Sequence, residues 1–132
     1  MTTQTGAGET AGAAVGTQRM LPAEATLLRI FVGEDDRTDG GPLYEAIVIK
    51  ARAAGLAGAT VLRGPMGFGA SSHLHTTKIL RLSQDLPLVI EIVDSKDKIT
   101  AFLPVLDAIM GSGLVTLEKV QVIRYGKSAA DA

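Results

Sequence analysis

The sequence predicts an α+β sandwich, in which an antiparallel sheet carries two helices on one of its faces. The hydrophobic period switches repeatedly along the chain, and the segments follow in the order strand, helix, strand, strand, helix, strand. A right-handed crossover leaves the first two strands parallel with a gap, which the third strand fills antiparallel. This arrangement is the ferredoxin-like βαββαβ sheet. With 132 residues and 46% hydrophobic side chains, the chain can bury one such core.

The first strand is expected over residues 27–32, an apolar and β-branched run that ends at Gly33. The first helix should open at Gly40-Gly41-Pro42, because proline in the first turn loses no helical hydrogen bond. Gly55 is a suitable C-terminal cap for this helix. Its buried stripe, at helical spacing, is predicted to be Leu43, Ile47, Ala51 and Ala54.

The second half of the chain repeats the pattern. A second strand is expected over 59–63, a third over 88–93 and a long fourth strand over 114–125. Ser95 should cap the second helix, since its hydroxyl can accept a hydrogen bond from a free backbone N–H. The apolar face of that helix is predicted to be Ile99, Phe102, Leu103, Leu106 and Ile109 or Met110.

Three regions follow from composition. Residues 1–26 are rich in Thr, Gly and Ala, and are expected to form a disordered leader without the apolar core of a secretory signal. Met20 is an alternative start. Residues 27–126 form the domain, and residues 127–132 are expected to be a flexible tail.

Composition also excludes several functions. The net charge is -1 and aromatic residues make up 4%, with no Trp, which argues against nucleic acid as a partner. No apolar run is long enough for direct membrane insertion, and the absence of cysteine fits a cytoplasmic location. The sequence has no nucleophile with an adjacent base and no paired carboxylates of a catalytic kind, so we do not expect an enzyme.

The sheet face turned away from the helices is predicted to be apolar as well. An apolar face without a helix layer has to be covered, and self-association is the simplest cover. On that face Arg29 and Glu91 should lie on neighbouring strands and form an ion pair. Strand alternation places four apolar side chains there, namely Leu27, Phe31, Val89 and Val93.

Two glycine-rich stretches are candidate anion sites. In Arg63–Gly69, three glycines would let backbone N–H groups approach an anion, although a glycine bulge closing a hairpin is the simpler interpretation. Gly111-Ser112-Gly113 follows the second helix, and Arg124 and Lys127 lie at the far end of the last strand. These residues together could hold a phosphate, whereas the glycines alone indicate a helix stop.

Two polar stretches leave alternatives open. His73 and His75 would project to the same side of an extended segment, as metal ligands do, but no third ligand is evident and structural loop histidines are the commoner case. If the loop is mobile, its polar side chains suit a segment that orders on binding. The acidic segment 33–37 could hold Mg²⁺ or a ribose, although a solvated turn is commoner. The polar side chains of the loop are Ser71, Ser72, His73, His75 and Thr76.

Eight segments of the chain occur in a distinctive order: GEDDR (33–37), PLY (42–44), AAGLAGATV (53–61), RG (63–64), GFG (67–69), HT (75–76), LPLVIEIVD (86–94) and GLVTLEKV (113–120). With these segments the chain resembles, over essentially all of 27–125, the prokaryotic family designated domain of unknown function 190. That family is grouped with the PII-like (nitrogen regulatory) signalling proteins. The resemblance implies a ferredoxin-like homotrimer, a flexible loop between the second and third strands, and a small-molecule site between subunits.

The resemblance also implies a site. In PII proteins a glycine loop after the second helix touches nucleotide phosphate, and basic residues end the last strand. Leu114 stands where PII chains have a lysine, and the loop expected at 69–77 lacks the tyrosine that some PII members modify. The resulting candidate ligand-binding residues are Arg63, Gly67, Gly69, Gly111, Ser112, Gly113, Arg124 and Lys127.

Two functions from different classes follow. In the first, a PII-like regulatory trimer binds an anionic ligand, an adenine nucleotide, between subunits. The loop 69–77 then relays this to a protein partner such as a membrane transporter. The alternative is a trimeric interaction module without a ligand, linked to ion (fluoride) transport or stress because family members are often encoded near fluoride-export genes. Metal binding through His73 and His75 is a third interpretation.

Overall fold

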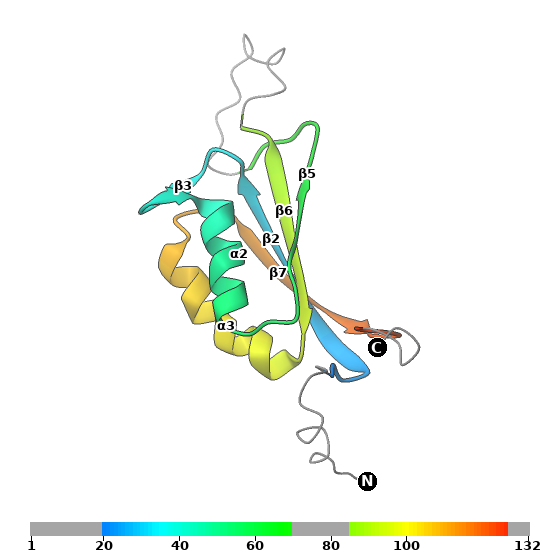
Figure 1. The fold of residues 1–132 in the computed structure, drawn as a ribbon. Coiled ribbons are helices and arrows are strands. Elements are labelled where there is room, and N and C mark those ends of the chain that lie inside the picture. Colours follow the sequence, from blue (N-terminus) through cyan, green and yellow to red (C-terminus); the bar gives the residue numbers. More distant parts are fainter. Residues whose placement is uncertain (1–19, 70–84, 127–132) are drawn as a thin grey trace.

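The computed structural model describes residues 20–69 and 85–126, which form one four-stranded sheet covered by two helices on one face (Figure 1). The strand order is β5-β6-β2-β7. A separate two-stranded ribbon, β3–β4, precedes the first helix. The elements are β2 (Glu24–Gly33), β3 (Arg37–Thr38), β4 (Gly41–Pro42), α2 (Leu43–Ala53), β5 (Thr60–Arg63), β6 (Pro87–Asp94), α3 (Lys96–Ile109) and β7 (Leu114–Gln121).

The predicted ferredoxin-like topology is confirmed. β2 runs antiparallel to both β6 and β7, and β5 runs antiparallel to β6. The strands β2 and β5 are therefore parallel, with β6 between them, as the sequence predicts. The central pair β2–β6 is in register from Thr26 opposite Asp94 to Gly33 opposite Pro87.

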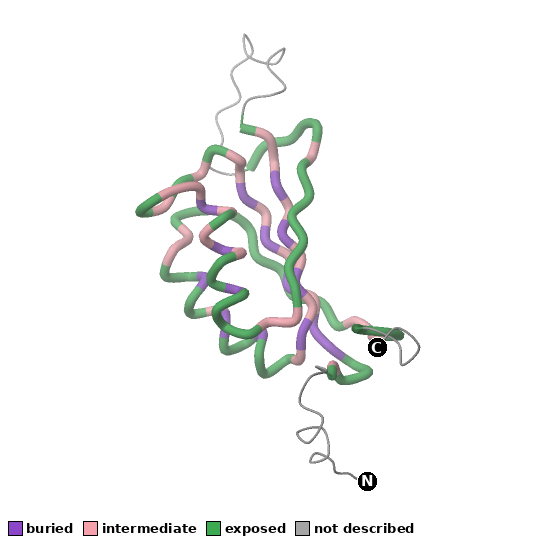
Figure 2. The backbone as a smooth tube through the Cα atoms, in the orientation of Figure 1, coloured by how far each residue is buried: buried purple, intermediate pink, exposed green. Residues whose placement is uncertain are grey.

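The core lies between the sheet and the helices, and it follows the alternation that the sequence predicts. Every second residue is buried from Thr26 onward in β2 and throughout β6, while the edge strand β5 is exposed along its length (Figure 2). One predicted core residue is wrong: Ala54 is exposed, because it caps the C-terminus of α2 and lies beyond the buried stripe. The core consists of Leu28, Ile30, Val32, Leu43, Ile47, Ala51, Leu88, Ile90, Ile92, Ile99, Phe102 and Leu106.

The helix ends follow capping chemistry with one correction. The Ser95 hydroxyl accepts the N–H of Lys98 at 3.2 Å, as predicted. Gly55 follows α2 with φ +76°, the left-handed conformation that favours glycine. Pro42 is the N-cap of α2 and belongs to β4, so the helix begins one residue later than a proline in the first turn would require.

Two strand boundaries differ from the prediction by more than one residue. β2 begins at Glu24, inside the segment expected to be a disordered leader, because Glu24–Thr26 pair with the end of β7. β7 ends at Gln121 and not at Tyr125, since β2 offers no partner beyond Glu24 except the Ala23 carbonyl, which accepts the Val122 N–H at 2.7 Å. Residues 1–19 and 127–132 lie outside the described residues.

Hydrogen bonds tie the loop between α2 and β5 to the rest of the domain. The Asp94 side chain, 1% exposed, accepts the N–H of Ala57 at 2.9 Å and that of Ser95 at 2.7 Å. The Tyr125 hydroxyl donates to the Ala57 carbonyl at 3.0 Å. The segment that follows β7, which includes Arg124, is thereby attached at the end of the sheet where β2 begins.

The outer face of the sheet, defined here as the face away from the helices, has the predicted composition. Its central ion pair is confirmed, with Arg29 Nε 2.9 Å from Glu91 Oε2 and with Glu118 at 3.8 Å from Arg29 Nη1. The four apolar side chains predicted for this face are half-buried: Leu27, Phe31, Val89 and Val93.

Candidate functional site

Several loops meet at the end of the sheet where β2 finishes. Because β2 is antiparallel to β6 and β7 and parallel to β5, the ends of β2 and β5 lie at the same edge as the starts of β6 and β7. This edge collects the segments that follow Gly33 and Arg63 and the segments that precede Pro87 and Leu114. Segments far apart in sequence can therefore build one site here.

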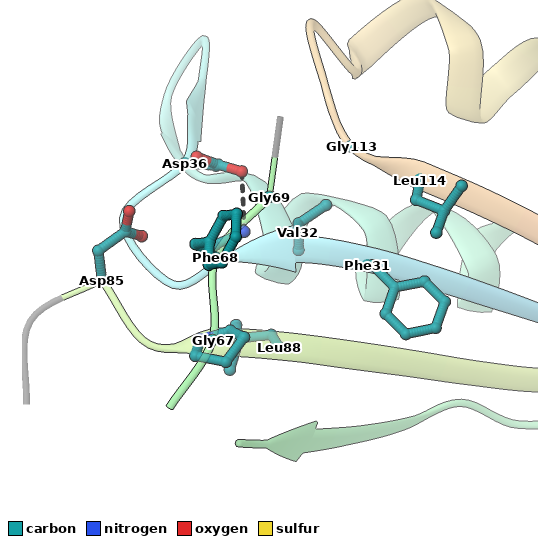
Figure 3. Close-up of a pocket in the computed structure, with 12 residues that line it drawn as sticks. Phe31, Val32, Asp36, Gly67, Phe68, Gly69, Asp85, Leu88, Gly113 and Leu114 are labelled. Carbon is teal, nitrogen blue, oxygen red and sulfur yellow. Dashed lines mark hydrogen bonds between the residues drawn. The ribbon is translucent and has the colours of Figure 1, made fainter. Parts of the chain in front are cut away.

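A pocket of about 410 Å³ opens at this edge, and we call it the strand-end pocket. Figure 3 shows that Phe31 and Leu114 lie at one end of it, while Asp36, Asp85 and Phe68 lie at the other. The volume is in the range of small-molecule sites, and the lining is largely apolar with few polar groups, as such sites usually are. The lining residues are Phe31, Val32, Gly33, Asp36, Gly67, Phe68, Gly69, Asp85, Pro87, Leu88, Gly113 and Leu114.

Gly113 lets β7 approach β2 at the floor of the pocket. A Cβ atom at this position would lie 2.8 Å from the Phe31 carbonyl oxygen and 2.6 Å from Met110 Cε. Its φ of +129° is also one that side chains disfavour. This glycine is therefore required by packing, whether or not a ligand binds beside it.

The acidic turn after β2 is built from its own side chains. Asp36 Oδ2 accepts the Gly33 N–H at 2.9 Å, and Asp85 Oδ1 accepts the Asp35 N–H at 3.1 Å. Glu34 forms an ion pair with Arg63 of β5. The predicted solvated turn thus has a defined hydrogen-bonded structure, and Arg63 is already neutralised by a carboxylate.

A second, more open pocket of about 730 Å³ lies beside the first, between α3 and the start of β7. Gly111 and Ser112 line it, and Gly113 lines both pockets. The turn 111–113 therefore separates the two cavities.

The predicted site residues divide into groups. The structure brings Gly67, Gly69 and Gly113 together around the strand-end pocket and places Arg63 beside it. It separates Arg124 from them, because the eight residues of β7 put about 25 Å between its two ends. The remaining candidates lie outside the described residues: Ser71, Ser72, His73, His75, Thr76 and Lys127.

Sequence reasoning does not bring most of these lining residues together at one site. It places Phe31 only on the outer face, Phe68 only within the glycine stretch 63–69, and Asp36 within the acidic segment 33–37, as a possible Mg²⁺ or ribose ligand or part of a solvated turn. Asp85, at the border of the described residues, was not considered. The signal that could have found them is the topology itself, since the βαββαβ order already places the end of the first strand beside the start of the third.

The described part of the chain contains neither a metal cluster nor a membrane-spanning helix. Within 20–69 and 85–126, no group of three or more His, Asp or Glu side chains could hold a metal ion. The two histidines proposed as weak ligands lie outside those ranges. No helix among the described residues is long and apolar enough to cross a membrane.

Solved structures define the class of fold. The chain is similar to a putative PII-like signaling protein from Thermus thermophilus, with a TM-score of 0.54 and 16% identity, covering 79% of this chain and 94% of that one. It is also similar to CPII from Thiomonas intermedia K12, bound to ADP and bicarbonate, with a TM-score of 0.50 and 20% identity, covering 76% and 90%. The fold is that of the PII-like proteins.

The family follows from sequence. Residues 25–122 match domain of unknown function 190, described as an uncharacterized ACR, and the chain belongs to this family. It is 42% identical to a UPF0166 protein of Aquifex aeolicus (strain VF5), covering 79% of this chain and 98% of that protein. It is 33% identical to a UPF0166 protein of Methanocaldococcus jannaschii, covering 76% and 94%.

Proposed function

We propose that this chain is a PII-like regulatory protein of the cytoplasm that binds an adenine nucleotide in the strand-end pocket. The proposal rests on one observation: Gly67, Gly69 and Gly113, from two distant segments, line one pocket together with Phe31 and Phe68. Aromatic rings can stack on a nucleobase, and glycines let backbone N–H groups approach an anion. The ADP-bound state of the similar CPII from Thiomonas intermedia supports the choice of ligand.

The site is completed by a second subunit of a homotrimer. No lysine or arginine is among the described residues that line the pocket, so phosphate needs a cation from elsewhere. Arg124 is exposed and lies at the opposite end of β7 in its own chain, about 25 Å from Gly113. A neighbouring subunit can supply it. The half-buried apolar outer face, which includes Phe31 and continues into the pocket, is the surface on which that neighbour would pack.

Ligand binding is relayed through the loop 69–77 to a protein partner, for which a membrane transporter is one candidate. Gly67 and Gly69 line the pocket and lead directly into that loop. A ligand seated against them would restrict the start of the loop and so change which conformations it presents.

The test is a calorimetric titration of ADP and AMP into the wild-type protein and two matched variants. Arg124→Ala should weaken binding about tenfold or more, because a charge-assisted hydrogen bond contributes roughly 1.5–3 kcal/mol. Arg52→Ala, which removes an exposed arginine at the end of α2, should leave the affinity unchanged. Equal affinity in all three proteins would reject the assignment of Arg124.

The second candidate is a trimeric interaction module that binds no small ligand. It is favoured by the steric role of Gly113, which explains that glycine without any phosphate. This candidate requires that adenine nucleotides, bicarbonate, fluoride and divalent metals all leave the melting temperature unchanged while the trimer persists. A shift with one nucleotide would reject it, since a ligand at 100 times its Kd adds about 2.7 kcal/mol to stability.

A further inference from the structure

The charge of the strand-end pocket bears on which nucleotide it accepts. Asp36 and Asp85 are the charged residues among the described lining, and both are acidic. One carboxylate oxygen of each residue accepts a backbone N–H: Asp36 Oδ2 accepts that of Gly33, and Asp85 Oδ1 accepts that of Asp35. The other oxygen of each has no partner among the described residues. Both carboxylates border the same end of the cavity (Figure 3).

Arg63, which lies beside the pocket, does not offset this charge. Arg63 precedes the glycines that line the pocket, but its guanidinium is paired with Glu34. Leu114 lines the pocket at the start of β7 and adds an apolar side chain there. Among the described lining residues, a ligand in this pocket therefore meets two negative charges, and a neighbouring Arg124 can balance one of them.

We infer that Asp36 and Asp85 are specificity-determining residues that make the pocket select the least phosphorylated adenine nucleotides, with AMP preferred over ADP and ADP over ATP. This inference rests on the proposed function and adds the phosphate count to it. The carboxylates accept hydrogen bonds from ribose hydroxyls or an amino group and repel each added phosphate. We take one carboxylate and one phosphate charge to lie about 8 Å apart, with an effective dielectric constant between that of a protein surface and that of water. Repulsion by that carboxylate then lowers the affinity about three- to tenfold for each added charge.

The experiment is a titration of AMP, ADP and ATP into the full chain at low salt, with EDTA present so that no metal masks the phosphates. The matched variants are Asp85→Asn and Asp36→Asn, which remove a charge but keep an oxygen that accepts the backbone N–H. Asparagine also tolerates the φ of +45° at position 85. The control is Asp97→Asn, which removes the same charge from the exposed first turn of α3, at the opposite end of the sheet.

We expect affinity to fall from AMP to ATP in the wild type. Each pocket variant should improve ATP relative to AMP about tenfold or more, because ATP carries two more negative charges than AMP. Asp97→Asn should leave the ratio of AMP affinity to ATP affinity unchanged. About 0.5 M salt should reduce this ratio by screening the charges. ATP binding as tightly as AMP, or an unchanged ratio in both pocket variants, would overturn the inference while leaving the proposed function intact. Failure of every nucleotide to bind any of the four proteins, with all of them folded by thermal melting, would overturn both.

Discussion

At the scale of single residues, the glycines at the candidate site have different physical reasons to be there. Gly113 brings β7 against the Phe31 carbonyl, and its φ of +129° is one that a side chain disfavours. Gly111, two residues earlier in the same turn, has open space around it and no positive φ. A sequence pattern such as Gly-Ser-Gly cannot separate these two cases, because the difference depends on which backbone atom lies opposite each Cα.

This difference predicts opposite outcomes for two equivalent substitutions. Gly113→Ala should lower the free energy of unfolding by about 2–4 kcal/mol, from overpacking against Phe31 and Met110 and from backbone strain. Gly111→Ala should change it by less than about 0.5 kcal/mol, as exposed substitutions usually do. Urea denaturation followed by circular dichroism measures both. Equal destabilisation would show that the turn is not held against β2 as described.

At the scale of elements, the sequence was sufficient wherever one face of an element is buried. The alternation in β2 and β6 and the helical stripe of α3 correctly predict which face of each element is buried. For each element, its period places the apolar side chains on one face only. The same alternation placed Arg29 opposite Glu91. Element ends were less predictable, because Glu24–Thr26 become a strand through pairing with β7 and not through their own pattern.

The candidate site was predictable only in part, for a related reason. Gly67, Gly69 and Gly113 could be proposed from their spacing, since glycine marks a backbone position open to close approach. Asp85 could not, because its role depends on the Asp35 N–H fifty positions earlier. Arg124 is grouped with the glycines by its charge and by the family resemblance, whereas within one chain β7 separates them.

The segment after β7 offers a test of how an element is positioned by one hydrogen bond. The Tyr125 hydroxyl donates to the Ala57 carbonyl at 3.0 Å, and the tyrosine is 40% exposed. Tyr125→Phe should therefore lower global stability by only about 0.5–1 kcal/mol. It should loosen residues 122–126 selectively, visible as faster amide exchange there and unchanged exchange in β2 and β6. Uniformly faster exchange across the sheet would contradict a local role for this contact.

At the scale of the whole molecule, the outer face is the feature that a single subunit leaves unexplained. It has a central ion pair, Arg29–Glu91, surrounded by half-buried apolar side chains and no helix layer. An apolar sheet face open to water is costly in a monomer, and a closed symmetric oligomer buries it without leaving a free surface. In the trimer proposed above, a second Arg124 completes the strand-end pocket, so assembly and ligand binding are expected to depend on each other.

Val89→Asp tests this dependence. Val89 lies on the outer face opposite Phe31 and Leu62, so an aspartate there would bury an unpaired charge in the assembly but stay half-exposed in a lone subunit. We expect light scattering to show monomers that keep wild-type circular dichroism, with subunit association weakened at least about a hundredfold, or roughly 2.7 kcal/mol. Val89→Lys should have the same effect. Because lysine cannot form an ion pair with Arg29, this variant shows that the result does not depend on such a pair. Val105→Asp, on the solvent-exposed side of α3, is the control and should leave the oligomeric state unchanged.

The same variants test whether assembly supports ligand binding. Because Arg124 cannot reach a neighbour when the subunits are separate, nucleotide affinity should fall in both Val89 variants by as much as in Arg124→Ala. A monomeric variant that binds nucleotide as the wild type does would place the whole site within one subunit and refute the composite arrangement.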